Sequence, residues 1–312
     1  MTTAATAKTP VVWLLTDGKP GHRNQLRGLA SRLQVLLGAS LYWLSTPEIA
    51  VSFWQALRAR APDIDAPSPH LILAAGSGTH RLLLALRRQP GCRTVVLMKP
   101  AFPRRWVDAM ILPQHDRVPA SKRVFTTLGA LNAITPLGQL TGKPEALLLI
   151  GGPSKHFVWD SDTILDQVRT LIQRYPDWRW TLANSRRTPA PLSHALNALE
   201  GVHITWVDHQ QTDADWVPQQ LARSRAVWVT PDSNSMVFEA LTAGVPTGLF
   251  SLTAKPGSRL AAGLGALVTD GYVTLWDQQA TLMSSSPRRP PPLWEADRAA
   301  RWLIQEVLGS QL

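Results

Sequence analysis

Short apolar runs alternate with amphipathic segments along almost the whole chain. Runs of four or five mostly apolar, β-prone residues predict strands at 11–15, 41–44, 71–75, 94–97, 109–112, 124–127, 146–150, 179–183, 203–207, 226–229 and 247–250. Apolar residues spaced three or four apart predict helices at 24–37, 51–60, 79–88, 162–174, 190–199, 216–223, 235–243 and 258–264, with a last amphipathic helix at 293–308. Such alternation favours parallel sheets with helices on both faces. We therefore predict an α/β fold with two doubly wound, Rossmann-like domains that face each other across a cleft.

The length of 312 residues, 45% of them hydrophobic, is sufficient for two domains of ordinary size. Glycine and proline punctuate 135–144, which is the best candidate for a domain boundary. We expect an N-terminal domain at 1–140, a C-terminal domain at 141–285, and a segment at 286–312. This last segment is a linker followed by a helix that braces the two domains.

The positive charge is confined to one half of the chain. Residues 1–140 contain 17 Lys and Arg against 6 Asp and Glu, a net charge of +11, whereas residues 141–312 contain 15 against 16, a net charge of −1. The N-terminal half therefore suits an acidic partner, such as an anionic membrane or a phosphorylated saccharide. An ordinary solvated basic face is the alternative. The basic residues are scattered and match no nucleic-acid-binding motif, so we expect no nucleic-acid partner.

Other features bear on the location of the protein. No apolar run reaches the length of about 18 residues that a membrane span requires. The first ten residues contain one lysine and no long apolar core, so we expect no signal peptide. The single cysteine, Cys92, excludes an internal disulfide and a cysteine-rich metal site. We expect a cytoplasmic protein that is free or peripheral at the inner membrane face.

The most informative segment is 226–246, where a predicted strand ends at Thr-Pro-Asp-Ser and a helix follows. Asp232 or Ser233 is the expected N-cap, and Gly244 closes the helix. The positive end of such a helix presents free N–H groups to an anion such as a diphosphate. Glu239, inside the helix, is suited to bind a ribose hydroxyl pair. An ordinary well-capped strand–helix unit would show the same pattern.

A second candidate segment is the turn at 16–22, Thr-Asp-Gly-Lys-Pro-Gly-His, between a buried strand and a helix. Gly18 and Gly21 allow positive φ and close approach of a ligand to the backbone. Asp17 and His22 bring a carboxylate and an imidazole into the same turn. The spacing matches neither a dinucleotide-binding glycine motif nor a P-loop.

Ligands of doubly wound domains bind at the carboxyl ends of the strands. In the first half these ends carry the turn at 16–22, Gly76 with Ser77, and His115. The second half contributes 151–156, 184–187, 208–210 and 230–235. Glycines, hydroxyls, basic groups and imidazoles therefore gather at one rim of each predicted sheet.

Four segments, in order along the chain, resemble the bacterial relatives of the mitochondrial-fission "elongated mitochondria" (ELM) family. They are 16–22 with Gln25 and 28–30, Gly151–Phe157, Ser185–Pro189, and the run Asp232-Ser233-x-Ser-Met-x-x-Glu239-Ala. Bacterial members are regarded as glycosyltransferases, some associated with lipo-oligosaccharide core assembly. The resemblance implies a GT-B fold, with the nucleotide sugar on the C-terminal domain and the acceptor on the N-terminal domain.

The resemblance also implies roles for individual residues. The loop at 151–156 would wrap the diphosphate, and Arg186 with Ser185 would neutralise it, because a guanidinium binds phosphate oxygens bidentately. Residues at the start of the helix after 230–233 would meet phosphate or sugar, and Glu239 the ribose. The expected substrate-binding residues are Gly18, Gly21, Gln25, Gly76, Ser77, Gly151, Gly152, Ser154, Lys155, His156, Ser185, Arg186, Asp232, Ser233, Ser235, Met236 and Glu239.

An inverting transfer requires a general base to deprotonate the acceptor hydroxyl. His22 is the first candidate, because lipid-linked glycosyltransferases of the peptidoglycan pathway carry a Gly-Gly-x-Gly-Gly-His loop at this place. Here Asp17 replaces the first glycine and Pro20 the fourth residue of that loop. Asp17 is an alternative base, or the group that orients His22, and His115 is a third candidate.

Three Asp-x-Asp triplets, at 63–65, 160–162 and 213–215, raise the question of a metal. The first lies in a proline-rich loop, and the other two precede predicted helices, where N-caps and dipole partners are expected. We expect no catalytic metal and no cofactor, with the nucleoside-diphosphate sugar as co-substrate. Arginine, lysine and helix N-termini would stabilise the leaving group.

Four functions stay open on the sequence. The first is an inverting glycosyltransferase that acts on a lipid-linked or core-saccharide acceptor at the cytoplasmic membrane face. The second is a nucleotide-sugar 2-epimerase, which needs neither acceptor nor membrane. The third is a non-catalytic membrane recruitment protein, as the plant relative is thought to be. A nucleic-acid binder is the fourth and is the least supported.

Overall fold

The computed structural model describes residues 9–309, so most of the N-terminal segment that the signal-peptide expectation concerns lies outside the described residues. The chain forms two compact units. Unit 1 contains residues up to Ala133 and again from Trp294, and unit 2 contains Ile134–Leu293. The division falls seven residues before the expected boundary at 140, and the expected linker-and-helix segment is divided between the units at Leu293.

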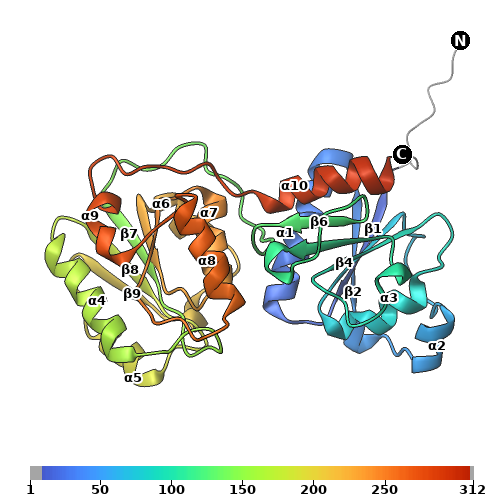
Figure 1. Cartoon of the computed structure of the whole chain (residues 1–312), viewed down its shortest axis with the longest axis horizontal. Coiled ribbons are helices and arrows are strands. Elements are labelled where there is room, and N and C mark those ends of the chain that lie inside the picture. Colours follow the sequence, from blue (N-terminus) through green and yellow to red (C-terminus); the bar gives the residue numbers. More distant parts are fainter. Residues whose placement is uncertain (1–8, 310–312) are drawn as a thin grey trace, which may run out of the picture. The chain divides into compact units, whose positions relative to one another are not determined.

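Unit 1 contains a six-stranded parallel sheet in the order β2-β1-β3-β4-β5-β6 (Figure 1). Its strands are β1 (Val11–Thr16), β2 (Ser40–Ser45), β3 (Leu71–Ala75), β4 (Arg93–Leu97), β5 (Ala109–Pro113) and β6 (Val124–Thr127). Successive side chains of a strand point to opposite faces. Val12 and Leu14 accordingly belong to one buried cluster, and Trp13 and Leu15 to another.

Helices cover both faces of this sheet. Helix α1 (Pro20–Leu37) packs with α10 (Glu295–Trp302) over the first face. The second face is covered by α3 (His80–Leu86), against which the short α2 (Phe53–Arg58) packs. A π-helical turn, Leu303–Leu308, continues α10.

Ion pairs and a close backbone approach fix α1 and α10 in unit 1. Arg32 Nε donates to Asp297 Oδ1 at 2.8 Å, and Arg301 Nε donates to the other carboxylate oxygen at 2.7 Å. A Cβ on Gly28 would lie 2.0 Å from the carbonyl oxygen of Asn132, so only glycine lets α1 approach this segment. Helix α1, which carries His22 in its first turn, is therefore held firmly along its length.

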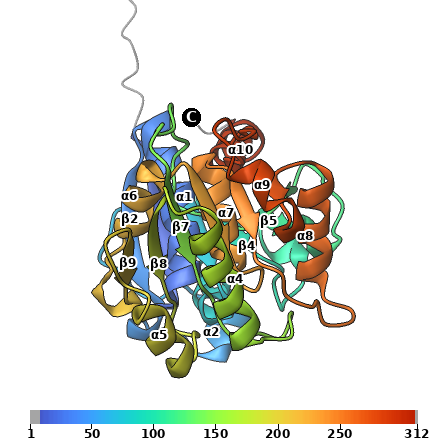
Figure 2. The same cartoon turned by 90° about the vertical axis from the view of Figure 1, so that its left-hand side faces the viewer.

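Unit 2 contains a second six-stranded parallel sheet, in the order β12-β11-β10-β7-β8-β9. Its strands are β7 (Glu145–Leu149), β8 (Arg179–Ala183), β9 (Ile204–Val207), β10 (Ala226–Val229), β11 (Thr247–Leu249) and β12 (Val273–Thr274). Helices α4 (Ser161–Arg174), α5 (Ala190–Asn197) and α9 (Gln279–Leu282) pack on one face (Figure 2). The other face is covered by α6 (Trp216–Arg223), α7 (Asn234–Ala243) and α8 (Arg259–Thr269). Short 3₁₀ turns occur at Thr46–Glu48, Ser77–Thr79, Arg104–Trp106, Gln114–Asp116, His209–Gln211 and Trp276–Gln278.

The predicted α/β fold with two Rossmann-like sheets is confirmed. Each predicted strand overlaps an observed one, but β12 and α9 were not predicted, because segments of two and four residues show no period. Helix α1 begins at Pro20 rather than at 24, since proline fits the first turn of a helix. Among the residues that the structure describes, no helix combines the length and the apolar character needed to cross a bilayer.

Candidate functional site

The strand order of each sheet identifies where a ligand is expected. Counted from β7, the order in unit 2 is 6-5-4-1-2-3, which is that of dinucleotide-binding Rossmann domains, and its switch point lies between β7 and β10. In unit 1 the switch point lies between β1 and β3. Ligands of such sheets bind outside the carboxyl ends of the strands at the switch point. In unit 2 the loop after β7 and the elbow after β10 lie at the switch point. In unit 1 the turn after β1 lies at the switch point.

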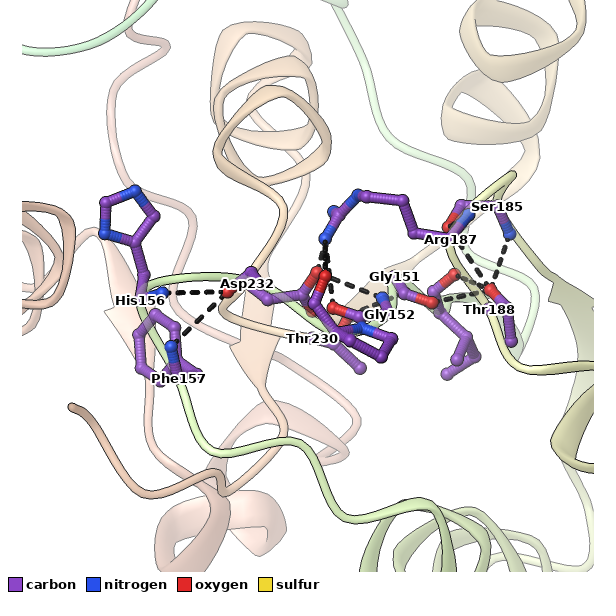
Figure 3. Close-up of polar contacts among 12 residues, drawn as sticks. Gly151, Gly152, His156, Phe157, Ser185, Arg187, Thr188, Thr230 and Asp232 are labelled. Carbon is purple, nitrogen blue, oxygen red and sulfur yellow. Dashed lines mark hydrogen bonds and ion pairs between the residues drawn. The ribbon is translucent and has the colours of Figure 1, made fainter.

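In unit 2 the glycine pair after β7 is held by the elbow after β10 (Figure 3). The N–H of Gly151 donates to Thr230 Oγ1 at 2.7 Å, and the N–H of Gly152 donates to Asp232 Oδ2 at 3.0 Å. Arg187, from the loop after β8, lies 2.7 Å from the same carboxylate oxygen and donates to the Gly152 carbonyl at 2.9 Å. The loops after β7, β8 and β10 are thus joined by one network.

Both positions require glycine because neighbouring atoms leave no room for a Cβ, and not because the backbone has a positive φ. A Cβ on Gly151 would lie 2.4 Å from Asp232 Oδ2, and a Cβ on Gly152 would lie 1.9 Å from the backbone oxygen of Arg187. Neither distance is tolerable for a real side chain. The pair therefore lets the loop after β7 pack directly against its two neighbours.

The carboxylate of Asp232 is fully buried and belongs to this network. Its Oδ2 accepts from Gly152 and Arg187, whereas its Oδ1 has no hydrogen-bond partner among the described residues. In this geometry the buried carboxylate of Asp232 holds the glycine loop in place.

Positive groups surround this network. Arg186 and Lys155 are exposed and form no hydrogen bond or ion pair with other residues that the structure describes. Lys255, which the sequence did not indicate, donates through Nζ to the carbonyl of Ser154 at 2.9 Å. Helix α7 begins at the elbow, and the side chain of its N-cap residue, Ser233, does not cap it. Its first N–H groups therefore lack the usual partner.

The remaining residues expected in unit 2 lie around this loop. The hydroxyl of Ser154 accepts from the N–H groups of His156 and Phe157 and so shapes the turn. The ring of His156 lies 3.2 Å from the hydroxyl of Ser258, the N-cap of α8. Ser185, Ser235, Met236 and Glu239 lie on the loop after β8 and on α7, and Glu239 is half-buried.

In unit 1 Asp17 and His22 form a close pair at the switch point. His22 Nδ1 lies 2.9 Å from Asp17 Oδ1 and 3.0 Å from Oδ2, with the carboxylate only 6% exposed and the imidazole 21%. Gly76, after β3, has φ of +91°, and a Cβ there would lie 2.2 Å from His22 Nδ1. A Cβ on Gly78 would lie 2.7 Å from the Cβ of Asp17. The two glycines therefore allow the loop after β3 to cover the pair.

The electrostatics of this pair favour an ionised carboxylate. Burial raises the pKa of Asp17, but hydrogen bonds from His22 and from the N–H of Lys19 outweigh that effect and bring the pKa below its usual value. An ionised Asp17 requires the hydrogen on Nδ1 of His22, which leaves Nε2 as the proton acceptor. Of the two alternatives for the base, this geometry favours His22, with Asp17 as the residue that orients it.

Other expected residues of unit 1 are spread more widely. Gln25 lies on α1, with its Nε2 3.9 Å from Met98 Sδ. Gly18, in the turn with φ of +79°, Gly21 and Ser77 are exposed near the pair. His115 follows β5, which β3 and β4 separate from β1, so the structure does not bring it to Asp17 and His22.

Unit 1 also contains a pocket of about 620 Å³, which neither Asp17 nor His22 lines. Gly78, which packs on Asp17, forms part of its wall, and Arg81 is the one charged residue that lines it. The wall is otherwise formed by Thr46, Pro47, Ile49, Ala50, Val51, Ser52, Gln55 and Leu82. The sequence did not indicate residues 46–55 of this wall, since they follow the edge strand β2 without a motif.

No group of three or more His, Cys, Asp and Glu side chains within residues 9–309 is arranged to hold a metal ion. The interpretation of the triplet at 160–162 as a helix start is confirmed, because Asp160 is the N-cap of α4 and accepts from the N–H groups of Asp162 and Thr163.

Two Rossmann-like domains with candidate residues at both switch points define a GT-B-type α/β protein. The family model described as "Mitochondrial fission ELM1" matches residues 20–307. The chain therefore belongs to the mitochondrial fission ELM1 family, as the four motif segments predicted.

The chain is also similar to individual proteins. RP120 of Rickettsia prowazekii, named as an uncharacterized protein, is 22% identical over 344 residues, which cover 93% of this chain and 96% of that protein. A Listeria monocytogenes structure assigned as a UDP-N-acetylglucosamine 2-epimerase has a TM-score of 0.65 at 13% identity and covers 97% of this chain and 98% of its own. The UDP-GlcNAc 2-epimerase of Neisseria meningitidis bound to UDP-GlcNAc has a TM-score of 0.55 at 10% identity, with 96% and 100% covered. At these identities the structural similarity establishes the shared fold.

Proposed function

We propose that the protein is a metal-independent, inverting glycosyltransferase that uses a nucleoside-diphosphate sugar. The observation that carries the proposal is the start of α7, which lies at the switch point of unit 2 without a side-chain cap. A helix N-terminus of this kind favours an anion through its free N–H groups and its dipole. Arg186 and Lys155, in the loops after β8 and β7, have no ion-pair partner among the described residues and add charge of the sign that a diphosphate requires.

On the donor side, each group has a distinct role in the proposal. The glycine loop and Arg187 are already engaged with Asp232, so they form the frame of the site. The diphosphate binds to Arg186, Lys155 and the first turn of α7, and Glu239, further along that helix, binds the ribose.

On the acceptor side, His22 is the general base. Its Nε2 removes the proton from the acceptor hydroxyl while that oxygen forms a bond to the anomeric carbon of the sugar. The bond from this carbon to the diphosphate oxygen breaks, and the nucleoside diphosphate leaves with the electron pair. Asp17 holds the ring and stabilises the imidazolium that forms.

The acceptor in this proposal is a lipid-linked or core saccharide at the cytoplasmic membrane face. The distribution of charge supports it. Unit 1 contains 19 Lys and Arg against 9 Asp and Glu, a net charge of +10, and unit 2 contains 13 against 13. An anionic surface or a phosphorylated acceptor would therefore be attracted to unit 1 alone.

A nucleotide-sugar 2-epimerase is the second candidate, because epimerases share this fold over nearly the whole chain. It predicts turnover of the nucleotide sugar with no acceptor present. Incubation with UDP-GlcNAc, followed by analysis of the sugar released on acid hydrolysis, distinguishes the two enzymes. A recruitment protein would give no turnover in either assay.

The test is a thermal-shift screen against UDP, GDP, CDP and TDP and their sugars. Uridine nucleotides come first, because structures of the same fold contain UDP or UDP-GlcNAc. A ligand at ~100 times its dissociation constant stabilises the folded state by about 2.7 kcal/mol. We expect a shift with one diphosphate that Arg186→Ala and Glu239→Ala each reduce. Arg174→Ala, an exposed arginine at the end of α4, is the matched control and should keep the shift. No shift with any nucleotide would refute both enzymatic proposals.

A further inference from the structure

Helix α2 of unit 1 exposes an apolar face. Phe53 and Trp54 are each 61% exposed and Leu57 is 40% exposed, although the helix has only six residues. The two aromatic rings contact each other edge to face, with centroids 5.6 Å apart. Single exposed apolar residues are common, but three within five positions form a patch that requires a partner.

The structure holds this patch in a fixed geometry. Ser52 and Gln55 form a capping box at the start of α2. At its end, the guanidinium of Arg87 donates to the carbonyl oxygens of Ala56 and Leu57. Two capped ends on so short a helix keep the aromatic side chains directed outward, which an unstructured loop would not do.

Arginines accompany the patch. The guanidinium of Arg58 lies 5.5 Å from the ring of Trp54, and Arg60 is exposed two residues further on. Arg81 in the neighbouring α3, and Arg88 shortly after its end, are also exposed. Asp63 and Asp65 in the next loop oppose part of this charge, but unit 1 as a whole has a net charge of +10. Figure 1 shows α2 beside α3 within unit 1.

Aromatic and aliphatic side chains flanked by arginines match one partner in particular. At a bilayer surface, tryptophan and phenylalanine lie at the headgroup boundary, and arginines contact lipid phosphates. We propose that α2 docks the protein on an anionic membrane, with Phe53, Trp54 and Leu57 inserted and Arg58 and Arg60 on the phosphates.

This docking deepens the proposed function and rests on it for its biological meaning. Gln55 of α2 and Arg81 of α3 both line the pocket of unit 1, and Gly78, which packs on Asp17, lines it too. A membrane bound by α2 would therefore lie next to that pocket, where the headgroup of a lipid-linked acceptor is available. Arg81 is the cation there for a phosphate of such an acceptor.

The test is co-sedimentation of the full chain with vesicles of phosphatidylcholine, alone or with 30% phosphatidylglycerol. We expect binding at least ~10-fold tighter to the anionic vesicles at low salt, since each arginine at such a surface changes affinity about fivefold, or ~1 kcal/mol. The double variant Phe53→Ser/Trp54→Ser should lose at least ~10-fold, because its inserted apolar area is gone. Arg58→Glu/Arg60→Glu should lose at least as much.

Matched controls separate docking from general charge and hydrophobicity. Val35→Ser removes an apolar side chain that is 69% exposed on α1, and Arg174→Glu reverses a charge in unit 2, so both should bind as the unchanged chain does. The proposal would be overturned if all variants bound the anionic vesicles equally well, or if the unchanged chain bound neutral and anionic vesicles equally well. It would also be overturned if the α2 residues mediated self-association of the protein without vesicle binding. The thermal shift with a nucleotide should survive the α2 substitutions, so a failure of docking is distinguishable from a failure of donor binding.

Discussion

The guanidinium of Arg187 lies 2.7 Å from the buried carboxylate of Asp232, and this ion pair joins the loops that follow β8 and β10. The adjacent Arg186 points to solvent and binds no residue that the structure describes. Two neighbouring arginines thus have different functions: one stabilises the frame of unit 2, and the other is free to bind a ligand.

Exchange of each arginine for alanine should separate these functions. Arg187→Ala leaves a buried carboxylate without its cation, so we expect the free energy of unfolding to fall by about 1.5–3 kcal/mol. Arg186→Ala should change it by less than about 0.5 kcal/mol, as is usual for exposed side chains. Urea unfolding followed by circular dichroism measures both. Equal stability of the two variants would contradict the division of roles.

The glycine pair should tolerate no side chain. In Gly152→Ala the new methyl would meet the backbone oxygen of Arg187, which cannot move without displacing its loop. Overpacking of this kind costs about 1–3 kcal/mol. Gly142→Ala is the control, because a Cβ there meets nothing within 4 Å. Thermal unfolding of both variants, with the nucleotide shift as a second readout, shows whether loop geometry and ligand binding fail together.

Substitutions in the Asp17–His22 pair should lower the rate of sugar transfer but leave the binding of the nucleotide sugar unchanged. His22→Gln removes the proton acceptor, so we expect sugar transfer to a host-cell lipid extract to fall by about 10²–10⁴-fold. Asp17→Asn should impair the same step, because the ring loses its orienting carboxylate. The nucleotide-induced thermal shift should be unchanged in both variants. Full transfer by His22→Gln would exclude this residue as the base.

The stability of unit 1 should fall at acidic pH, because Asp297 becomes protonated and loses its ion pairs with Arg32 and Arg301. Burial raises the pKa of this carboxyl, but hydrogen bonds from Arg301 and Arg32 outweigh it, so the pKa in the folded state lies below the usual 3.8. A lowered folded-state pKa means that the stabilisation is complete above pH 3.8 and is lost as the pH falls further. Asp297→Asn should therefore be less stable than the unchanged chain at pH 6, by about 1–3 kcal/mol. The melting temperatures of the two proteins should converge below pH 3.8, and a constant difference down to pH 2 would refute this linkage.

Apolar runs and the helical spacing of apolar residues were sufficient to predict nearly every strand and helix, because the strands are buried on both faces and each helix buries one face. The same pattern indicated the polar residues that follow the strands. It did not reveal the strand order that brings the loops after β7 and β10 together, since pairing depends on contacts distant in sequence. Nor did it show which of two adjacent arginines turns inward, because that depends on the local path of the loop.

The boundary between the units also depends on contacts that are distant in sequence and that the sequence pattern did not reveal. Arg289 donates to the carbonyl oxygens of Leu137, Gly138 and Gly244, and so fastens two distant segments to the end of α7. Glycine and proline near 135–144 indicated a break in regular structure, but not that residues 134–140 already belong to unit 2. Arg289, together with the packing of Leu137 and Leu140 on the core of unit 2, places this segment there.

The return of the chain to unit 1 has a consequence for its synthesis. Ala296, Ala299 and Leu303 of the C-terminal segment are buried with Leu29 and Leu33 in the core of the N-terminal unit. When a ribosome has just released residue 293, every residue of unit 2 is available, whereas the unit made first still lacks part of its interior. Unit 1 therefore cannot bury Leu29 and Leu33 completely until α10 has been made, although its strands precede those of unit 2 in the chain. Because domains usually fold in the order of their synthesis, we expect the nascent unit 1 to expose apolar side chains of α1 during that interval.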